Sequence, residues 1–296
     1  RGLSVFILAG AIFFLILVPF IGSEEGGAKR WIKIGILSFQ PSEVAKVAVV
    51  MSFASLMSIY REKMQTFRYG VLPFAVILVV VCGLVALERH FSGVLIILAL
   101  GAAMMFLGGA QLRWFAIGAA AVGIFAAVYL TTMGYASARV TAWRDPMSDP
   151  SDTGYQILQS LYAIGSGGLM GLGFGRSRQK YLYLPEEHND YIFPIVCEEL
   201  GFVGAVAVIL LFVLLIVRGY WIAMHARDRF GALLAAGLTT HLALQTFLNI
   251  GVVTNFLPST GISLPFFSYG GTALLIQLFE MGLILAVSRQ NDNKLL

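Results

Sequence analysis

The chain has 296 residues, of which 58% are hydrophobic and only 12% are charged. Soluble domains carry about 25% charged residues, so this composition excludes an ordinary soluble protein and predicts one whose solvent is the lipid bilayer. The net charge of +4 comes from scattered basic residues, which favours contact with anionic lipid and excludes nucleic acid as a partner. The two cysteines lie in apolar runs and predict neither a disulfide nor redox chemistry.

Long apolar segments predict an all-α, polytopic membrane protein forming a single transmembrane domain over residues 1–296. A helix needs about 20 residues to cross the hydrocarbon core. The first segment has one leading arginine and no small-residue cleavage site, so we expect a helix and not a signal peptide. The eight predicted spans are residues 3–21, 42–59, 71–87, 93–107, 112–130, 195–217, 231–253 and 263–287.

Basic residues in the connecting segments predict the orientation. An even number of spans places both termini on the same side of the membrane, and the segments rich in arginine and lysine assign that side to the cytoplasm. Residues 131–194 then form one large extracytoplasmic loop. Its tryptophan, tyrosines and glycines indicate a folded loop, and a loop of this length is often functional. We expect a multi-pass protein of the bacterial cytoplasmic membrane.

Glu43 and Lys46 are the first candidate functional residues. Pro41 suits the first turn of a helix, so the two side chains lie three residues apart on one helix face. Ionisable groups at membrane depth face a polar cavity or each other. Two interpretations stay open: an ion pair that braces two helices, and a cavity wall whose lysine offers positive charge to an anionic substrate.

Asp190 is the second candidate, within the polar stretch YLPEEHND that precedes the sixth span. Pro185 breaks any helix, and Asp190 comes two residues before the apolar run, so it lies where water meets the bilayer. It is either the N-cap of the next helix or a functional carboxylate. Glu198 and Glu199 follow inside the helix, and at least one of them must point into the protein.

Upstream, Arg139 and Arg144 bring guanidinium groups that bind phosphates well. The alternative is that Asp145, Asp149 and Asp152 neutralise them at the surface. Together with the carboxylate and the lysine, these residues suit a phosphorylated substrate presented by the membrane.

Two further motifs lie in the same loop. The glycine segment, residues 165–175, either supplies a mobile wall and backbone N–H donors or allows close helix packing. The spacing from Ser177 to Lys180 matches the S-x-x-K of penicillin-binding enzymes, but the companion KTG and SDN motifs are missing, so we interpret it as chance.

Three longer motifs resemble one known family. GAKRWIKIGILSFQPSEVAKVA, the stretch from GYQILQS to CEELGFVGA, and LPSTGISLPFFSYGGTALL are similar to the shape, elongation, division and sporulation (SEDS) family. The passage SRQKYLYLPE favours its FtsW/SpoVE-like branch over RodA. Members have ten helices, so two N-terminal family helices are expected to be absent from this chain. The resemblance implies a peptidoglycan glycosyltransferase that polymerises lipid II, working with a class B penicillin-binding protein and other division or sporulation proteins.

The resemblance also implies roles for particular residues. The family's essential loop aspartate falls on Asp190, and His90 stands where an acidic residue is usual. Asn255 and Phe256 also depart from the family pattern. The residues predicted to bind substrate are Glu43, Lys46, Arg139, Arg144, Gln156, His188 and Glu199.

The expected chemistry is an inverting transfer that releases undecaprenyl pyrophosphate. Asp190 removes a proton from the attacking sugar hydroxyl, and Arg139, Lys46 and Arg144 offer charge to the leaving pyrophosphate. Alternatively, Asp190 holds a divalent cation such as Mg²⁺ or Mn²⁺. Two other functions remain open. A lipid II flippase would depend on residues near the midplane, such as His241, Gln245 and Glu280, and a non-catalytic division scaffold would tolerate loss of Asp190.

Overall fold

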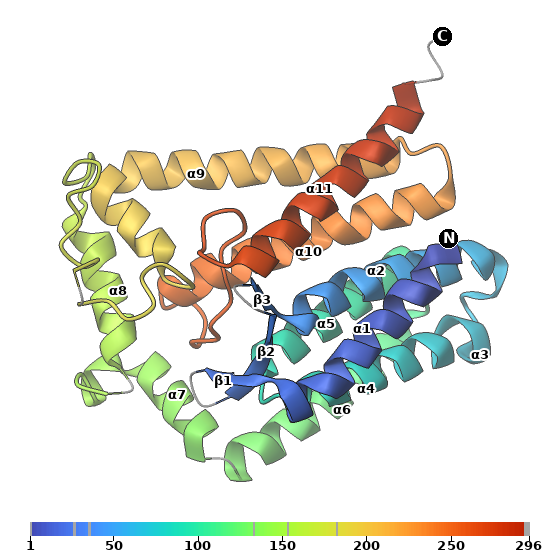
Figure 1. Cartoon of the computed structure of the whole chain (residues 1–296), viewed down its shortest axis with the longest axis horizontal. Helices are drawn as coiled ribbons and strands as arrows, with labels where there is room; N and C mark the ends of the chain where they lie inside the picture. Colours follow the sequence, from blue (N-terminus) through green and yellow to red (C-terminus); the bar gives the residue numbers. More distant parts are fainter. Residues whose placement is uncertain are drawn as a thin grey trace. The chain divides into compact units, whose positions relative to one another are not determined.

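The computed structural model describes residues 2–25, 28–34, 37–132, 134–152, 154–181 and 183–292. Each predicted span corresponds to a helix: α1 (Gly2–Ile21), α2 (Pro41–Ile59), α4 (Leu72–Leu87), α5 (Phe91–Leu107), α6 (Leu112–Thr132), α9 (Ile192–Met224), α10 (Arg229–Val253) and α11 (Gly271–Asp292) (Figure 1). Shorter helices are η1 (Arg61–Lys63), α3 (Phe67–Gly70), α7 (Gly134–Arg144), η2 (Pro146–Ser148) and α8 (Tyr155–Ser166).

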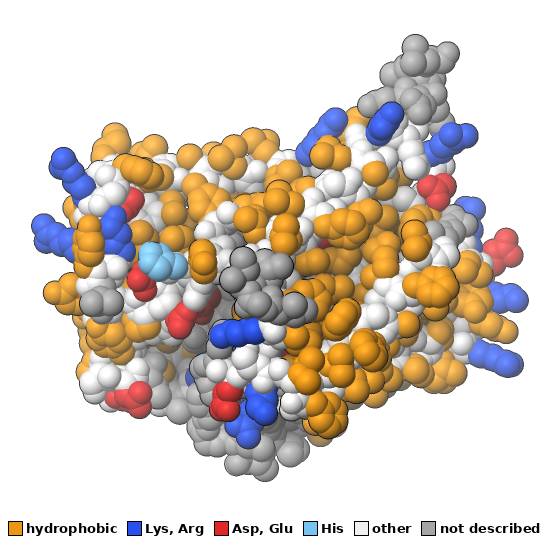
Figure 2. Space-filling model, viewed as in Figure 1, with side chains coloured by type: hydrophobic (Ala, Val, Ile, Leu, Met, Phe, Trp, Pro, Cys, Tyr) orange, Lys and Arg blue, Asp and Glu red, His pale blue; other side chains and the backbone are white. Residues whose placement is uncertain are grey.

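Six helical segments of the described chain are long and apolar enough to cross a membrane, and two shorter apolar helices accompany them, Phe91–Leu107 and Leu112–Ile124. The all-α membrane class is therefore confirmed. Large apolar side chains are exposed along these helices, as expected where lipid replaces water. Figure 2 shows hydrophobic side chains covering much of the surface on the face it presents.

Two features differ from the sequence predictions. A small antiparallel sheet, ordered β1 (Ser23–Glu25), β2 (Ala28–Ile34) and β3 (Leu37–Phe39), follows α1 and was not predicted. The last helix begins at Gly271, whereas the predicted span begins at residue 263. Pro265 disfavours a helical conformation at the residue before it, and Phe266 has φ 65°, so residues 263–270 cannot continue the helix.

The chain divides into two compact units, which are described separately. The first unit consists of residues 1–115, 215–244 and 270–296, and the second unit of residues 116–214 and 245–269. Each unit has its own cluster of buried hydrophobic side chains.

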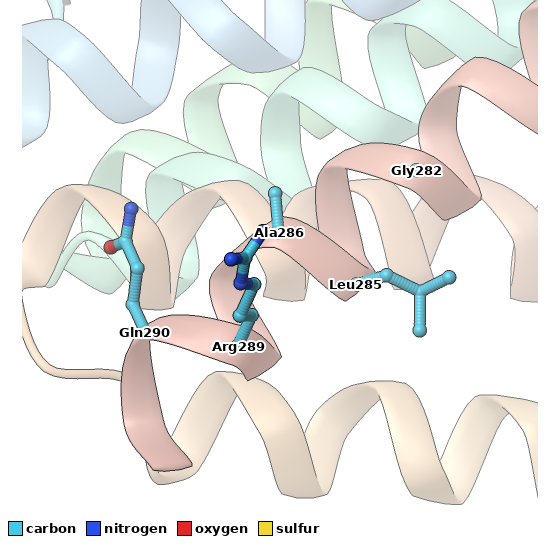
Figure 3. A pocket seen from close by; sticks show the side chains of 5 residues that line it. All are labelled: Gly282, Leu285, Ala286, Arg289 and Gln290. Carbon is cyan, nitrogen blue, oxygen red and sulfur yellow. The ribbon is translucent and has the colours of Figure 1, made fainter. Parts of the chain in front are cut away.

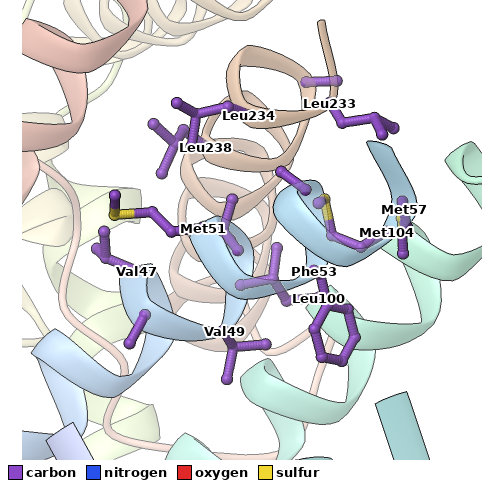
Figure 4. Close-up of a cluster of buried hydrophobic side chains, with 14 of the residues drawn as sticks. Val47, Val49, Met51, Phe53, Met57, Leu100, Met104, Leu233, Leu234 and Leu238 are labelled. Atoms are coloured by element: carbon purple, nitrogen blue, oxygen red, sulfur yellow. The ribbon is translucent and has the colours of Figure 1, made fainter. Parts of the chain in front are cut away.

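Helix α2 is the central helix of the first unit. Its side chains are buried on all faces, which explains why its hydrophobic residues show no single stripe. Figure 4 shows Val47, Met51 and Phe53 of α2 among side chains of α5 and α10. Gly237 of α10 allows this packing, because a Cβ there would lie 2.4 Å from Met104 Sδ and 2.6 Å from Val50 Cγ1.

Helix α9 of the second unit is broken at Gly201, which has φ 66° and ψ −169° (Figure 1). The glycine segment lies along this break and uses the peptide groups that the break leaves without helical partners. Leu172 N donates to Glu198 O at 2.9 Å, and Phe202 N donates to Gly168 O at 2.9 Å. The two backbones approach so closely that a Cβ on Gly171 would lie 2.1 Å from Glu199 O.

Candidate functional site

Asp190 lies in the second unit, in the turns that lead into α9. Asn249 of α10 holds its backbone: the buried side-chain amide donates to Asp190 O and to Ile262 O, both at 2.7 Å. The carboxylate of Asp190 faces Gly261, where an added Cβ would lie 3.5 Å from Oδ2. Gly261 has φ 65°, a backbone conformation that favours glycine. Asp190 is therefore held against the loop that follows α10.

The environment of Asp190 makes it a stronger base than an ordinary aspartate. Burial raises the pKa of its carboxyl from 3.8 to about 7. The nearby Glu186 also raises this pKa, whereas Arg139 and a backbone hydrogen bond lower it. A carboxyl with a pKa near 7 is present in both protonation states at neutral pH, as general acid–base catalysis requires.

The N-cap interpretation of Asp190 is not supported by the helix boundary. Helix α9 begins at Ile192, so the residue directly before it is Tyr191. Asp190 is one residue further out and remains half-buried beside the loop that follows α10.

Arg139 belongs to the same region. It extends from α7, is half-buried, and its Nη1 donates to Ser259 O at 3.1 Å. Its guanidinium lies close enough to Asp190 to lower the pKa of that carboxyl. Arg144 is exposed in the last turn of α7. Of the two predicted arginines, the structure therefore brings Arg139 to Asp190.

Asn255 explains how α7 is attached to the loop after α10. Trp143 Nε1 donates to Asn255 O at 3.1 Å, and Asn255 Nδ2 donates back to Trp143 O at 3.3 Å. Asn255 has φ 59°, a conformation that asparagine tolerates better than most residues. Asn255, which departs from the family pattern, therefore has a structural role: it ties α7 to the segment that carries Ser259.

Gln156 and His188 support the turns around Asp190. Gln156 Nε2 donates to Pro185 O at 3.4 Å. The imidazole of His188 is exposed, with Nε2 3.4 Å from Glu187 Oε1, and its carbonyl accepts from Tyr269 N at 2.7 Å. Both residues therefore contact the segment in which the carboxylate lies.

Glu198 and Glu199 point into the protein, as predicted for at least one of them. Glu198 accepts hydrogen bonds from Ser177 Oγ at 2.5 Å and from Arg178 N at 3.1 Å. Glu199 accepts from Gly175 N at 2.9 Å and forms an ion pair with Lys180 Nζ at 2.8 Å. Both carboxylates fasten the turn after the glycine segment to α9.

The Lys180 ammonium is bound to Glu199 and to Gly175 O, so its charge is committed to that ion pair. Ser177 is fully buried, and its hydroxyl is bound to Glu198. Neither side chain of the S-x-x-K match is available for catalysis. The glycine segment packs closely against α9 and donates several of its backbone N–H groups to it.

Glu43 and Lys46 belong to the first unit, where they form an ion pair with Nζ 2.8 Å from Oε2. Both side chains are buried. A second buried pair joins α10 to α11, with His241 Nδ1 2.8 Å from Glu280 Oε1. Among its described residues, the first unit therefore holds a buried Glu–Lys ion pair and a buried His–Glu contact within its spanning helices, where unpaired polar groups would be costly.

The turn between α4 and α5 adds two titratable groups to the first unit. Burial raises the pKa of Glu88 to about 8, opposed by Arg30. Burial and Arg30 lower the pKa of His90 to about 4, and its Nδ1 lies 3.3 Å from Ser42 Oγ. At neutral pH, His90 is therefore uncharged and Glu88 is largely protonated.

Among the described residues, no group of three or more His, Cys, Asp or Glu side chains is arranged to hold a metal ion. Mg²⁺ is commonly bound by one or two carboxylates together with substrate phosphates, so Asp190 stays a candidate ligand for a divalent cation that a pyrophosphate would help to hold. A surface pocket on α11, lined by Gly282, Leu285, Ala286, Arg289 and Gln290, contains no carboxylate (Figure 3).

Sequence reasoning missed the residues that hold Asp190 and Arg139 in place: Asn249, Ser259 and Gly261. Ser259 and Gly261 lie in the motif LPSTGISLPFFSYGG, which points to the right segment but not to its contacts. Asn249 lies in an apolar helix, where a buried amide must find partners.

The fold and the site define an all-α, multi-pass membrane protein with a titratable carboxylate at the start of a broken helix. Residues 1–293 match the sequence model of the FtsW/RodA/SpoVE family, described as cell cycle proteins. The chain therefore belongs to this family, the SEDS proteins.

Named relatives and solved structures agree with this assignment. The chain is 41% identical over 282 residues to "Probable peptidoglycan glycosyltransferase FtsW" of Geobacter sp. (strain M18), covering 94% of this chain and 77% of that protein. It is 39% identical to "Stage V sporulation protein E" of Bacillus subtilis, covering 94% of this chain and 76% of that protein.

Among solved structures, a chain of a peptidoglycan synthase complex superposes with a TM-score of 0.82 at 29% identity, covering 98% of this chain and 82% of that chain. The rod shape determining protein RodA of Thermus thermophilus gives 0.71 at 28% identity, with 98% and 79% covered.

Proposed function

We propose that the chain is a peptidoglycan glycosyltransferase that polymerises lipid II, with Asp190 as its catalytic base. Relatives about 40% identical carry the name peptidoglycan glycosyltransferase. The observation that carries the choice of base is the half-buried carboxylate of Asp190, with a pKa of about 7, beside Arg139.

The proposed step is a single displacement. The carboxylate takes the proton of the attacking sugar hydroxyl, the oxygen bonds to the anomeric carbon, and the bond to the lipid pyrophosphate breaks with inversion. One base is enough because pyrophosphate leaves without being protonated by a general acid, whereas glycosidases, retaining and inverting alike, use a pair of carboxyl groups. Arg139 supplies positive charge near the reacting groups as the pyrophosphate leaves. Lys46, held by Glu43, and Arg144 are proposed as further contacts for the anionic substrate.

The orientation follows from the basic loops. Both termini are proposed to lie in the cytoplasm, and Asp190 at the outer face, where lipid-linked precursors present their sugars to water. The similar chain in the peptidoglycan synthase complex belongs to an assembly that coordinates polymerization and crosslinking. A class B penicillin-binding protein is the partner we propose for this chain, together with other division or sporulation proteins.

Labelled lipid II tests the proposal, using the purified protein with its partner. Asp190→Asn keeps the shape and the backbone hydrogen bond from Asn249 but cannot accept a proton, so glycan strands should disappear. Asp152→Asn, an exposed carboxylate of the same loop, serves as the matched control and should leave polymerisation unchanged. Normal strand formation by the Asp190 variant would exclude Asp190 as the base and bring the scaffold interpretation forward.

The rate should also depend on pH. Because the base must be deprotonated, kcat/KM should rise about tenfold per pH unit below pH 7 and level off above it. A profile that is flat between pH 5 and 8 would contradict this assignment.

A second function, movement of lipid II across the bilayer, is favoured by one observation. The buried pair His241–Glu280 lies inside the spanning helices, and such groups often mark transport pathways. Glu280→Gln should then abolish lipid II transfer between the leaflets of vesicles. If no variant and no parent protein moves lipid II between the leaflets, while Asp190→Asn abolishes polymerisation, the His241–Glu280 pair has a structural role.

A further inference from the structure

The glycine segment is a rigid part of the second unit. Gly173 N donates to Glu199 O at 3.1 Å, and Val203 N donates to Leu169 O at 3.2 Å. Gly175 N is held by the Glu199 carboxylate at 2.9 Å. Because these bonds lie on both sides of the break at Gly201, the segment keeps a constant position relative to α9.

The length of α9 gives the depth of this segment in the membrane. The helix has 33 residues, more than the hydrocarbon core requires. The apolar part after Gly201 runs to Val217, before the exposed Arg218, and is about 24 Å long at 1.5 Å per residue, slightly less than the roughly 30 Å core. The break, and the glycine segment bonded to it, therefore lie close to the edge of the hydrocarbon core.

The surface of the segment is apolar. Leu169, Met170 and Phe174 are 70%, 78% and 88% exposed, although the backbone that carries them is firmly bonded. The apolar surface continues on α9 through Phe202 and Val203, which are also exposed. In a spanning helix such side chains face lipid, so the tip of the segment adjoins a lipid-facing surface.

Cationic side chains follow immediately. Arg176 and Arg178 are exposed next to these apolar residues. Apolar side chains that enter the boundary between headgroups and acyl chains, flanked by arginines at the headgroup level, are typical of interfacial membrane anchors.

We propose that Leu169, Met170 and Phe174 insert into the leaflet at this end of α9, while Arg176 and Arg178 bind the phosphates of anionic lipids. The occupant of this surface is lipid and not a protein, because the surface continues the lipid-facing side of α9 and carries positive charge. The anchor holds the broken end of α9 at a constant height. If the proposed function is correct, it also determines how far Asp190 stands above the lipid surface.

A cysteine-labelling experiment on the full chain in vesicles tests the anchor. Phe174→Cys and Met170→Cys are labelled with an environment-sensitive fluorophore. Ser151→Cys, exposed in a polar turn, is the matched control, and the parent chain, whose two cysteines are buried, gives the background. Quenching by lipids with a spin label at the headgroup is compared with quenching by iodide in the water phase.

Labels at positions 170 and 174 should be quenched several-fold more by the lipid than the label at position 151, and several-fold less by iodide. Removing anionic lipid, or combining Arg176→Gln with Arg178→Gln, should reduce the lipid quenching. Equal access of iodide to all three positions would overturn the proposal, as would protection only after a partner protein is added. The readout needs no catalysis, so failure of the anchor is distinguishable from failure of the glycosyltransferase proposal.

Discussion

Replacing Asp190 with Asn should stabilise the protein at alkaline pH while it removes activity. The folded state holds the pKa of this carboxyl at about 7, against 3.8 for the ordinary group. The folded protein thus binds the proton more tightly than the unfolded chain does, and its stability falls as pH rises from about 4 to about 7. Asn carries no charge at any pH and escapes this loss.

The structure gives an upper limit for the effect. A difference of about three pH units corresponds to about 4 kcal/mol at 1.36 kcal/mol per unit. Because water reaches part of the carboxylate, we expect the gain in unfolding free energy to be about 1–3 kcal/mol at pH 8 and clearly smaller at pH 5.

Thermal unfolding in detergent or nanodiscs at the two pH values measures the effect, with Asp152→Asn as the exposed control. The midpoint of the Asp190 variant should exceed that of the parent chain at pH 8 by more than it does at pH 5. The same change at both pH values, or a loss at pH 8, would refute a carboxylate whose pKa is raised by burial.

Three further substitutions probe the packing and the site. Gly171→Ala should destabilise the protein by more than about 2 kcal/mol, because its Cβ would meet Glu199 O at 2.1 Å where φ is 79°, whereas Gly165→Ala, with open space around it, should cost nothing in thermal unfolding. Glu43→Ala should cost about 3–5 kcal/mol by leaving Lys46 buried without its partner, and converting both residues to apolar ones should restore most of that loss. Asn249→Ala removes the hydrogen bond to the Asp190 backbone and the one to Ile262 O, and should lower kcat by up to about 10²-fold with little change in KM, an outcome that a purely stabilising role would not produce.

Much of the membrane fold could be predicted from the sequence because the bilayer imposes a simple length rule. Apolar runs of about 20 residues must become helices, since no water is available for exposed peptide groups. The length rule does not fix where a helix begins, and the predicted start of the last span at residue 263 was wrong. Pro265 and the conformation of Phe266 prevent a helix there, so α11 begins only at Gly271. The short sheet after α1 was missed for a similar reason, because it depends on pairing between neighbouring strands.

The candidate site was only partly predictable. Asp190 could be singled out because a carboxylate next to an apolar run is unusual. Its carboxyl pKa near 7 could not be predicted, because burial raises it and Arg139, which is 51 positions away in the chain, opposes that rise.

The sequence by itself determined which segments span the membrane and that Glu198 or Glu199 must face inward, because both follow from the cost of placing polar groups in hydrocarbon. Only the tertiary structure decided what those groups touch. In the folded protein, Asn249 donates to the Asp190 backbone and Arg139 donates to Ser259 O. The glycine segment forms backbone hydrogen bonds on both sides of the break in α9. These contacts join segments far apart in the chain, and their geometry depends on how whole helices pack.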